Sequence, residues 1–347
     1  LDRAPFNPQS AGPEDIKTNV EINIPTGANW FEVELVDPFE DLEIEDIEYA
    51  PSSDLYVSNS NPYGPGKLAV TTTEVSAGMN GAPVDMLVMT PELVDGDFPI
   101  IVFQHGFIMA ASNYSEVLAQ VASHGFVVVA PQMYEPGGLP IGKPSTEEET
   151  ALAIDLYNWL DTELEGMVNV NVDMAAMGLA GHSRGGKVAW ATLLQDTGLA
   201  VAVAGVDPVD GSEGPFATDT KMLTGPVPFS MPSLVIGTGL GQDQGIGGFA
   251  PACAPEGQNH VQFYSALPSP AWYVIVDNFG HNDMLNDDGC GFECLACPSG
   301  GAKAVMRKTV AGLLTAFFRG SLVGEEGEYA ILEDPNGAPT AITTEWK

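Results

Sequence analysis

The sequence predicts an α/β fold in which a mostly parallel sheet is covered by helices on both faces. Short, fully apolar segments such as 99–103 and 126–130 recur along the chain, as expected of strands that are buried on both faces. These segments alternate with segments of helical spacing, and strands that alternate with helices form parallel sheets. The 347 residues, of which 44% are hydrophobic, are sufficient for one large domain of this kind.

The expected elements follow one another in a regular order. Strands are expected at 67–73, 84–90, 99–103, 126–130, 175–180, 199–206, 233–237 and 272–276. Helices are expected at 114–123, 147–164, 185–195 and 303–319. The first two strands should form a hairpin, because the turn-prone Met79-Asn80-Gly81 lies between them. Gly125 ends the first helix, and the pattern Ser145-x-x-Glu148 predicts a capping box at the start of the second.

The composition along the chain predicts one catalytic domain with an extension at each end. Residues 1–66, rich in acidic residues and proline, are expected to form an N-terminal extension, 67–325 the catalytic domain, and 326–347 a C-terminal tail. The whole chain has 12 basic and 47 acidic residues, which gives a net charge of −35. This charge argues against nucleic-acid binding, because neutralisation of phosphates requires a basic surface.

Four cysteines lie in the C-terminal third of the chain: Cys253, Cys290, Cys294 and Cys297. Their even number favours disulfides, but the sequence permits three pairings and does not choose between them. A metal site is not expected, because no histidine or further cysteine lies at ligand spacing near the Cys-x3-Cys-x2-Cys cluster.

The segment Gly181-His182-Ser183-Arg184-Gly185 lies between an expected strand and an expected helix. A serine at such a sharp turn holds its hydroxyl above the sheet, as in the nucleophile elbow of α/β-hydrolases. The sequence therefore predicts the α/β-hydrolase fold, with Ser183 as the nucleophile. The expected oxyanion donors are the backbone N–H groups of Arg184 and of Phe107, which lies in the loop after strand 99–103.

The expected general base is His281, because it follows the last predicted parallel strand and this fold orders its triad as Ser, acid, His. His182 is expected to be turned away by the elbow and to pack in the core. The other histidines are expected to brace a loop, end a helix or lie in a Pro/Gly-rich loop: His105, His124 and His260. Three aspartates could supply the acid. Asp207 ends strand 199–206 and is favoured, and Asp210 and Asp243 are the alternatives.

Six segments of the sequence resemble the chlorophyllases of plants and algae, which belong to the α/β-hydrolase superfamily. They are 123–132 (SHGFVVVAPQ), 178–187 (GLAGHSRGGK), 205–211 (GVDPVDG), 231–241 (MPSLVIGTGLG), 253–255 (CAP) and 280–285 (GHNDML). The resemblance covers about 67 to 322, and the combination is more specific than the elbow alone. The acidic N-terminal region and the charge of −35 depart from the higher-plant pattern and suggest an algal source.

The resemblance implies hydrolysis of chlorophyll to chlorophyllide and phytol through an acyl-enzyme on Ser183, with His281 and the Asp207 region as triad partners. Chlorophyll and related phytylated tetrapyrroles would be the substrates, with transient contact to membranes that carry them. No cofactor and no protein-bound metal are implied, since the magnesium belongs to the substrate. A chloroplast location is implied, with secretion or another oxidising compartment as the alternative. The alternative activity is that of a broad-specificity lipase or carboxylesterase related to platelet-activating-factor acetylhydrolase.

A substrate with a flat macrocycle and a C20 tail requires a broad apolar mouth. We expect this mouth to be formed by the segment after Phe107 and by the long loops 211–231 and 241–270, which are of a length often found in lids. The expected lining residues are Ile108, Met109, Phe216, Phe229 and Phe249. The alternative is that these side chains only pack their loops onto the domain.

Overall fold

The computed structural model describes residues 61–92, 96–138, 142–211, 221–245, 248, 250–287 and 296–347. The chain divides into two units, 1–50 and 51–347, and every described residue belongs to the second. The predicted N-terminal extension falls almost entirely on residues 1–60, which lie outside the described residues. Within the described part, no helix is both long enough and apolar enough to cross a membrane.

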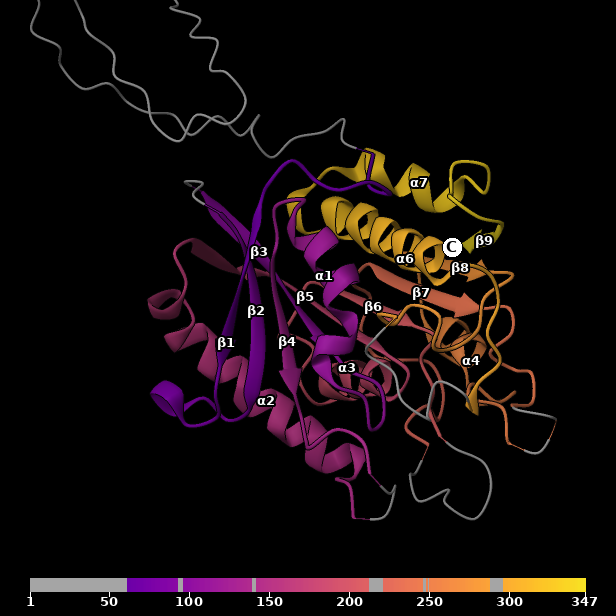
Figure 1. The fold of residues 1–347 in the computed structure, drawn as a ribbon, viewed down its shortest axis with the longest axis horizontal. Helices are drawn as coiled ribbons and strands as arrows, with labels where there is room; N and C mark the ends of the chain where they lie inside the picture. The colour runs from indigo at the N-terminus through magenta and orange to yellow at the C-terminus, as the bar shows by residue number, and fades with distance from the viewer. Residues whose placement is uncertain are drawn as a thin grey trace, which may run out of the picture. The chain divides into compact units, whose positions relative to one another are not determined.

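The centre of the second unit is a mixed sheet with the order β1-β2-β4-β3-β5-β6-β7-β8-β9 (Figure 1). Its strands are β1 (Val70–Val75), β2 (Asp85–Pro91), β3 (Asp97–Gln104), β4 (Val127–Gln132), β5 (Asn171–His182), β6 (Ala202–Val206), β7 (Ser233–Thr238), β8 (Ala271–Val276) and β9 (Ile342–Trp346). The strands from β3 to β8 run parallel to one another, and β1, β2 and β9 pair antiparallel at the two sides. The carboxyl ends of six parallel strands therefore meet at one edge of the sheet.

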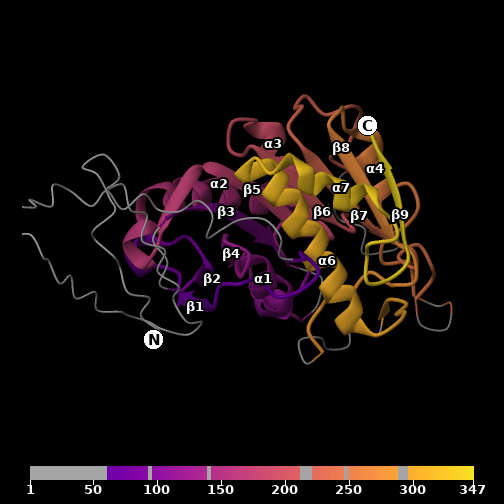
Figure 2. The same ribbon diagram turned by 90° about the horizontal axis from the view of Figure 1, so that it is seen from above.

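Helices cover both faces of this sheet, as Figures 1 and 2 show. They are α1 (Ser115–Ala122), α2 (Thr146–Glu163), α3 (Arg184–Gln195), α4 (His260–Ala266), α6 (Lys303–Phe318) and α7 (Tyr329–Glu333). Two apolar cores result: one contains buried residues of α1, α6 and α7, and the other contains those of α2, α3 and α4. The predicted fold class, an α/β-hydrolase fold with a mostly parallel sheet, is confirmed.

Local signals set several helix and strand ends as predicted. Ser145 and Glu148 form the expected capping box at the start of α2, with each side chain accepting a hydrogen bond from the other's backbone N–H. The hairpin of β1 and β2 pairs with Thr71 opposite Thr90. Strand β6 begins at Ala202 rather than at 199, because Val201 and the residues before it belong to the turn that leaves α3.

The C-terminal segment 326–347 differs from the expected tail. It contains α7 and β9, and β9 pairs antiparallel with β8, with Trp346 opposite Trp272. The Trp272 ring also stacks on Tyr329 of α7, with the ring centroids 4.1 Å apart. Both elements are only five residues long, so their sequence pattern is weak, and contact with β8 and α6 stabilises them instead.

Candidate active site

Ser183 lies at the turn between β5, which ends at His182, and α3, which begins at Arg184. Its backbone has φ 55° and ψ −122°, a conformation that non-glycine residues rarely adopt outside functional sites. The turn requires glycine on both sides: a Cβ at Gly181 would lie 2.3 Å from the carbonyl carbon of Gly185, and one at Gly185 would lie 2.2 Å from the Gln104 carbonyl oxygen. The tight approach leaves the serine half-exposed above the sheet.

Three side chains from three strand ends form a continuous hydrogen-bonded series. His281 Nε2 lies 2.9 Å from Ser183 Oγ, and His281 Nδ1 lies 2.7 Å from Asp207 Oδ2. Ser183 follows β5, Asp207 follows β6 and His281 lies in the loop after β8. The structure thus brings together the predicted nucleophile, base and favoured acid, which are separated by up to 98 residues in sequence.

The Asp207 carboxylate is fully buried and has several hydrogen-bond donors. Thr238 donates from its hydroxyl to Oδ2 at 2.6 Å and from its backbone N–H to Oδ1 at 3.2 Å. Burial alone would raise the pKa of Asp207, but interactions with His281, His260 and Thr238 outweigh it and hold the pKa below its usual value. Because this carboxylate is ionised and accepts from His281 Nδ1–H, the unprotonated Nε2 of His281 is the nitrogen that faces Ser183 Oγ.

The two alternative acids lie elsewhere. Asp210 is buried beside Lys187, with Nζ 3.5 Å from Oδ1, and its carboxylate accepts hydrogen bonds from the backbone N–H groups of Met222 and Leu223. It therefore anchors the segment that begins at 221 onto α3. Asp243 is exposed, and its backbone N–H donates to the Leu240 carbonyl. Neither aspartate contacts His281.

The remaining histidines are buried and mostly neutral, because burial lowers the pKa of His105 and of His124 to about 4 and that of His182 to about 3. His124 follows α1 and lies within 2.9 Å of the Gly64 carbonyl. His260 is not in a loop as expected but is the first residue of α4, where the Asn259 capping box fixes the helix start. The His260 Nε2 atom lies 3.9 Å from Asp207 Oδ1, so this histidine lies beside the aspartate and not beside the serine.

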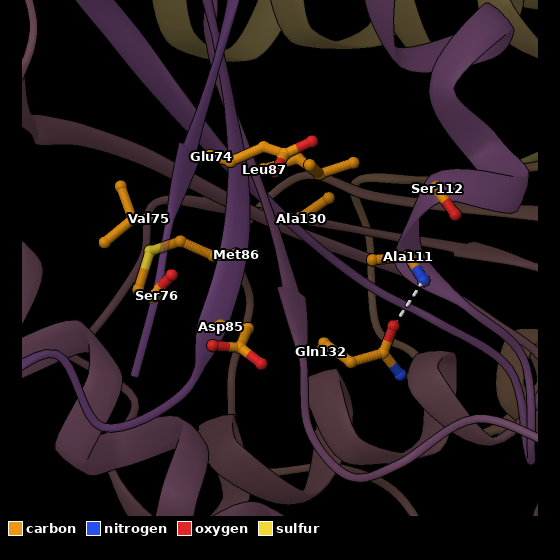
Figure 3. Close-up of a pocket in the computed structure, with 10 residues that line it drawn as sticks. All are labelled: Glu74, Val75, Ser76, Asp85, Met86, Leu87, Ala111, Ser112, Ala130 and Gln132. Atoms are coloured by element: carbon orange, nitrogen blue, oxygen red, sulfur yellow. Dashed lines mark hydrogen bonds between the residues drawn. The ribbon is translucent and has the colours of Figure 1, made fainter. Parts of the chain in front are cut away.

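The predicted oxyanion loop is held by the end of β4. The Gln132 side chain accepts from the Ala111 N–H at 2.8 Å, the bond drawn in Figure 3, and donates to the Met109 carbonyl at 3.2 Å. The guanidinium of Arg184 lies 5.0 Å from the centre of the Phe107 ring. The two predicted oxyanion donors therefore belong to residues whose side chains are in contact.

Arg184 also connects the elbow with the start of α2. Its guanidinium pairs with the buried Glu149 carboxylate at 2.6 Å and donates to the Pro144 carbonyl. The carboxylate of this pair is buried, so removal of the arginine would leave it without its ionic partner. Arg184 therefore links the strand-to-helix turn to the start of α2.

The loop that bears His281 is held by contacts far along the chain. The Asp283 carboxylate accepts hydrogen bonds from the N–H groups of Gly280 and Gly300, both at 2.7 Å. A disulfide joins Cys253 to Cys297, and the Asn282 side chain contacts the Cys297 sulfur at 3.2 Å.

The disulfide between Cys253 and Cys297 belongs to one of the three pairings that the sequence permits for the four cysteines. Cys290 and Cys294 lie outside the described residues. Among the residues that the structure describes, no group of histidine, cysteine and carboxylate side chains could hold a metal ion.

The structure places the expected substrate-lining residues in different parts of the molecule. Ile108 is half-buried and Met109 is buried in the oxyanion loop, whereas Phe216 and Phe249 lie outside the described residues. The expectation for Phe229 is wrong, because this residue is buried just before the amino end of β7, at the opposite edge of the sheet from Thr238 and the serine. A chain that joins two parallel strands must return to the amino edge, so the last residues of the 211–231 loop leave the site.

A pocket of about 370 Å³ lies away from this site (Figure 3). Its lining residues come from β1, β2, β4 and the segment after the oxyanion loop: Glu74, Val75, Ser76, Asp85, Met86, Leu87, Ala111, Ser112, Ala130 and Gln132. None of the three hydrogen-bonded side chains lines it. It shares only Gln132 and Ala111 with the contacts that hold the oxyanion loop.

The parallel sheet, the helices on both faces and the strand-to-helix turn define an α/β-hydrolase. The chlorophyllase family profile matches residues 58–346. Among its relatives, Chlorophyllase-2 of Arabidopsis thaliana is 34% identical over 278 residues, which cover 76% of this chain and 85% of that protein. "Chlorophyllase-1, chloroplastic" of Citrus sinensis is 35% identical, with 78% and 83% covered, and Chlorophyllase type 0 of Chenopodium album is 32% identical, with 77% and 80% covered. The chain belongs to the chlorophyllase family.

Proposed function

We propose that this chain is a serine esterase that cleaves the phytyl ester of chlorophyll, releasing chlorophyllide and phytol. The observation that carries the proposal is the hydrogen-bonded series from Ser183 Oγ through His281 to the buried Asp207, in a chain of the chlorophyllase family. The printed names of the relatives support the substrate class, and the geometry of the three side chains supports the reaction type.

In the proposed first step, Ser183 Oγ attacks the ester carbonyl carbon while His281 Nε2 takes the hydroxyl proton. The N–H groups of Phe107 and Arg184 would stabilise the oxyanion, and each such donor typically contributes about 3 kcal/mol. The tetrahedral intermediate collapses as His281 returns the proton to the phytol oxygen. Asp207 stabilises the imidazolium during both transfers.

The product of the first step is an ester between Ser183 and the carboxyl group of the chlorophyllide. His281 then removes a proton from water, whose oxygen attacks this ester, and the proton passes to Ser183 Oγ as chlorophyllide leaves. The proton that leaves on phytol comes from Ser183 and is replaced by one from water, so the scheme requires only the three side chains and water and invokes no cofactor. We place the reaction in the chloroplast, with transient contact to substrate-bearing membranes; the Citrus relatives named chloroplastic support this location.

The test is hydrolysis of chlorophyll a by the purified chain, with Ser183→Ala as the control and a short-chain p-nitrophenyl ester as a second substrate. We expect chlorophyllide from the unsubstituted chain and almost none from the variant. Cleavage of the short ester without chlorophyllide would favour the alternative, a broad-specificity carboxylesterase. Activity in Ser183→Ala on either substrate would exclude Ser183 as the nucleophile.

A further inference from the structure

Three buried groups beside the site take no part in the proposed reaction, yet they connect two of its parts. The N–H of Gly106 lies 2.9 Å from Tyr114 Oη, Tyr114 Oη lies 2.8 Å from His182 Nδ1, and His182 Nε2 lies 2.9 Å from the His281 carbonyl oxygen. This series, the Gly106–His281 relay, starts one residue before Phe107 and ends on the backbone of His281.

The direction of every hydrogen bond in the relay follows from its two ends and from the neutral state of His182. A backbone N–H can only donate and a carbonyl oxygen can only accept, so Tyr114 Oη accepts from Gly106 and His182 Nε2 donates to the His281 carbonyl. Burial lowers the pKa of His182 to about 3, so the ring is neutral and its one proton is the one on Nε2. His182 Nδ1 therefore accepts the proton of the Tyr114 hydroxyl.

The residues around the relay are closely packed. Tyr114 and His182 are both fully buried, and the His182 ring lies 4.5 Å from the His281 ring, centre to centre. A Cβ at Gly106 would lie 2.9 Å from His182 Nδ1 and 3.0 Å from Tyr114 Oη. The bare glycine backbone is thus what allows the loop to approach these two side chains.

A second histidine fixes the other side of the same loop. His105 Nε2 accepts from the Met133 N–H at 3.0 Å, so its proton is on Nδ1, which lies 2.8 Å from the Gly106 carbonyl oxygen. In a trans peptide the C=O and the following N–H point in opposite directions. Holding the Gly106 carbonyl therefore also sets the direction of the Phe107 N–H, the proposed oxyanion donor.

We propose that Tyr114 and His182 are positioning residues, which hold the oxyanion loop and the backbone of His281, the proposed base, in a fixed position relative to each other. The inference rests on the proposed function. A nucleophile, a base and an oxyanion donor must be aligned to within a fraction of an ångström, and the relay connects two of the three without touching substrate. His182 is therefore more than the core-packing residue that its place in the elbow suggests.

The activity test compares Tyr114→Phe with Tyr157→Phe. Both substitutions remove one buried hydroxyl, but Tyr157 Oη hydrogen-bonds with the side chains of Gln104, at 3.3 Å, and Thr192, and lies outside the relay. We expect Tyr114→Phe to lower kcat on the p-nitrophenyl ester about 10-fold to 100-fold with KM within about twofold, less than the loss of an oxyanion donor itself. Tyr157→Phe should keep kcat within about twofold. Equal kcat in the two variants would overturn the proposal.

A second measurement needs no variant activity. Long-range ¹H–¹⁵N spectra of the ¹⁵N-labelled chain at pH 7 report which ring nitrogen of each histidine carries the proton, with His182→Gln and His105→Gln used only to assign signals. We expect opposite tautomers, Nε2–H for His182 and Nδ1–H for His105. A proton on His182 Nδ1, or a charged ring, would overturn the relay even where Tyr114→Phe fails to fold.

The two tests also separate this inference from the proposed function. If Ser183→Ala abolishes hydrolysis and Tyr114→Phe does not slow it, the positioning role fails and the esterase stands. If the unsubstituted chain hydrolyses neither ester, the proposed function fails and the positioning role fails with it, whatever the histidine tautomers.

Discussion

Ser183 and His281 face each other across 2.9 Å, but the chain holds them in different ways. Ser183 is held by its neighbours in sequence: the end of β5, the start of α3 and the two glycines that permit the turn. His281 is held by distant residues, through Asp207, the His182 hydrogen bond to its carbonyl, and the disulfide of Cys297. The proposed nucleophile thus depends mainly on local sequence and the proposed base mainly on tertiary contacts, and each support can be removed separately.

The largest expected effect comes from Asp207, the proposed acid, which accepts a hydrogen bond from His281. Asp207→Asn should lower kcat roughly 10⁴-fold, because an amide does not hold the imidazole in the tautomer that accepts the serine proton. Asp243→Asn, in an exposed position, is the matched control and should keep full activity. The measurement is kcat on the p-nitrophenyl ester. If Asp243→Asn were the inactive variant, the acid would be misassigned.

The next effect is expected from removal of the disulfide that holds the loop bearing His281. The Cys253–Cys297 disulfide closes a loop with a sequence separation of 44, for which chain entropy predicts stabilisation of about 4 kcal/mol. The double variant Cys253→Ser, Cys297→Ser should lose up to that amount of unfolding free energy in urea titrations. An unchanged transition would show that the hydrogen bonds of Asp283 hold the His281 loop without the disulfide.

Addition of a single methyl group at the turn that bears Ser183 should lower both stability and activity. Gly185→Ala places a Cβ 2.2 Å from the Gln104 carbonyl oxygen, so backbone must move, and overpacking of this kind costs about 1–3 kcal/mol. Activity should fall with stability because the displaced atoms belong to the serine turn. Gly166→Ala, where nothing lies within 4 Å of the new Cβ, is the control and should be close to neutral in the same urea titration. Similar losses in both variants would contradict the steric argument.

The supports of both loops should also make the stability of the fold depend on pH. Burial holds the pKa of His105 at about 4 and that of His182 at about 3, whereas an unfolded histidine has a pKa near 6.5. Between pH 6.5 and about 4 the unfolded chain takes up protons that the folded chain does not, so the stability these groups contribute is complete above pH 6.5 and falls as the pH falls.

Below pH 6.5 the expected slope approaches about 1.4 kcal/mol per pH unit for each of these histidines, which amounts to about 2 kcal/mol per histidine between pH 7.5 and pH 5. The unfolding free energies at these two pH values measure it. His105→Gln should flatten the pH dependence by about one histidine's share, and an unchanged slope would mean that His105 is charged in the fold.

How much of the site could be predicted depended on the distance over which each signal acts. The glycines of the elbow and the capping box at Ser145 act within a few residues, so the turn and the start of α2 were predictable from the pattern. Phe229 was misplaced because composition marks it as apolar without saying to which edge of the sheet its loop has returned. The choice among Asp207, Asp210 and Asp243 stayed open for the same reason, since all three follow strands.

By itself, the sequence determined the fold class, the serine turn and the kinship with chlorophyllases, because apolar periodicity and glycine at fixed offsets act along the chain. Only the tertiary structure decided that Asp207 is the aspartate in contact with His281, that residues 342–346 complete the sheet, and that His182 connects the oxyanion loop to the base. These contacts join residues up to 99 positions apart, and no local pattern encodes which distant partners packing will bring within hydrogen-bond distance.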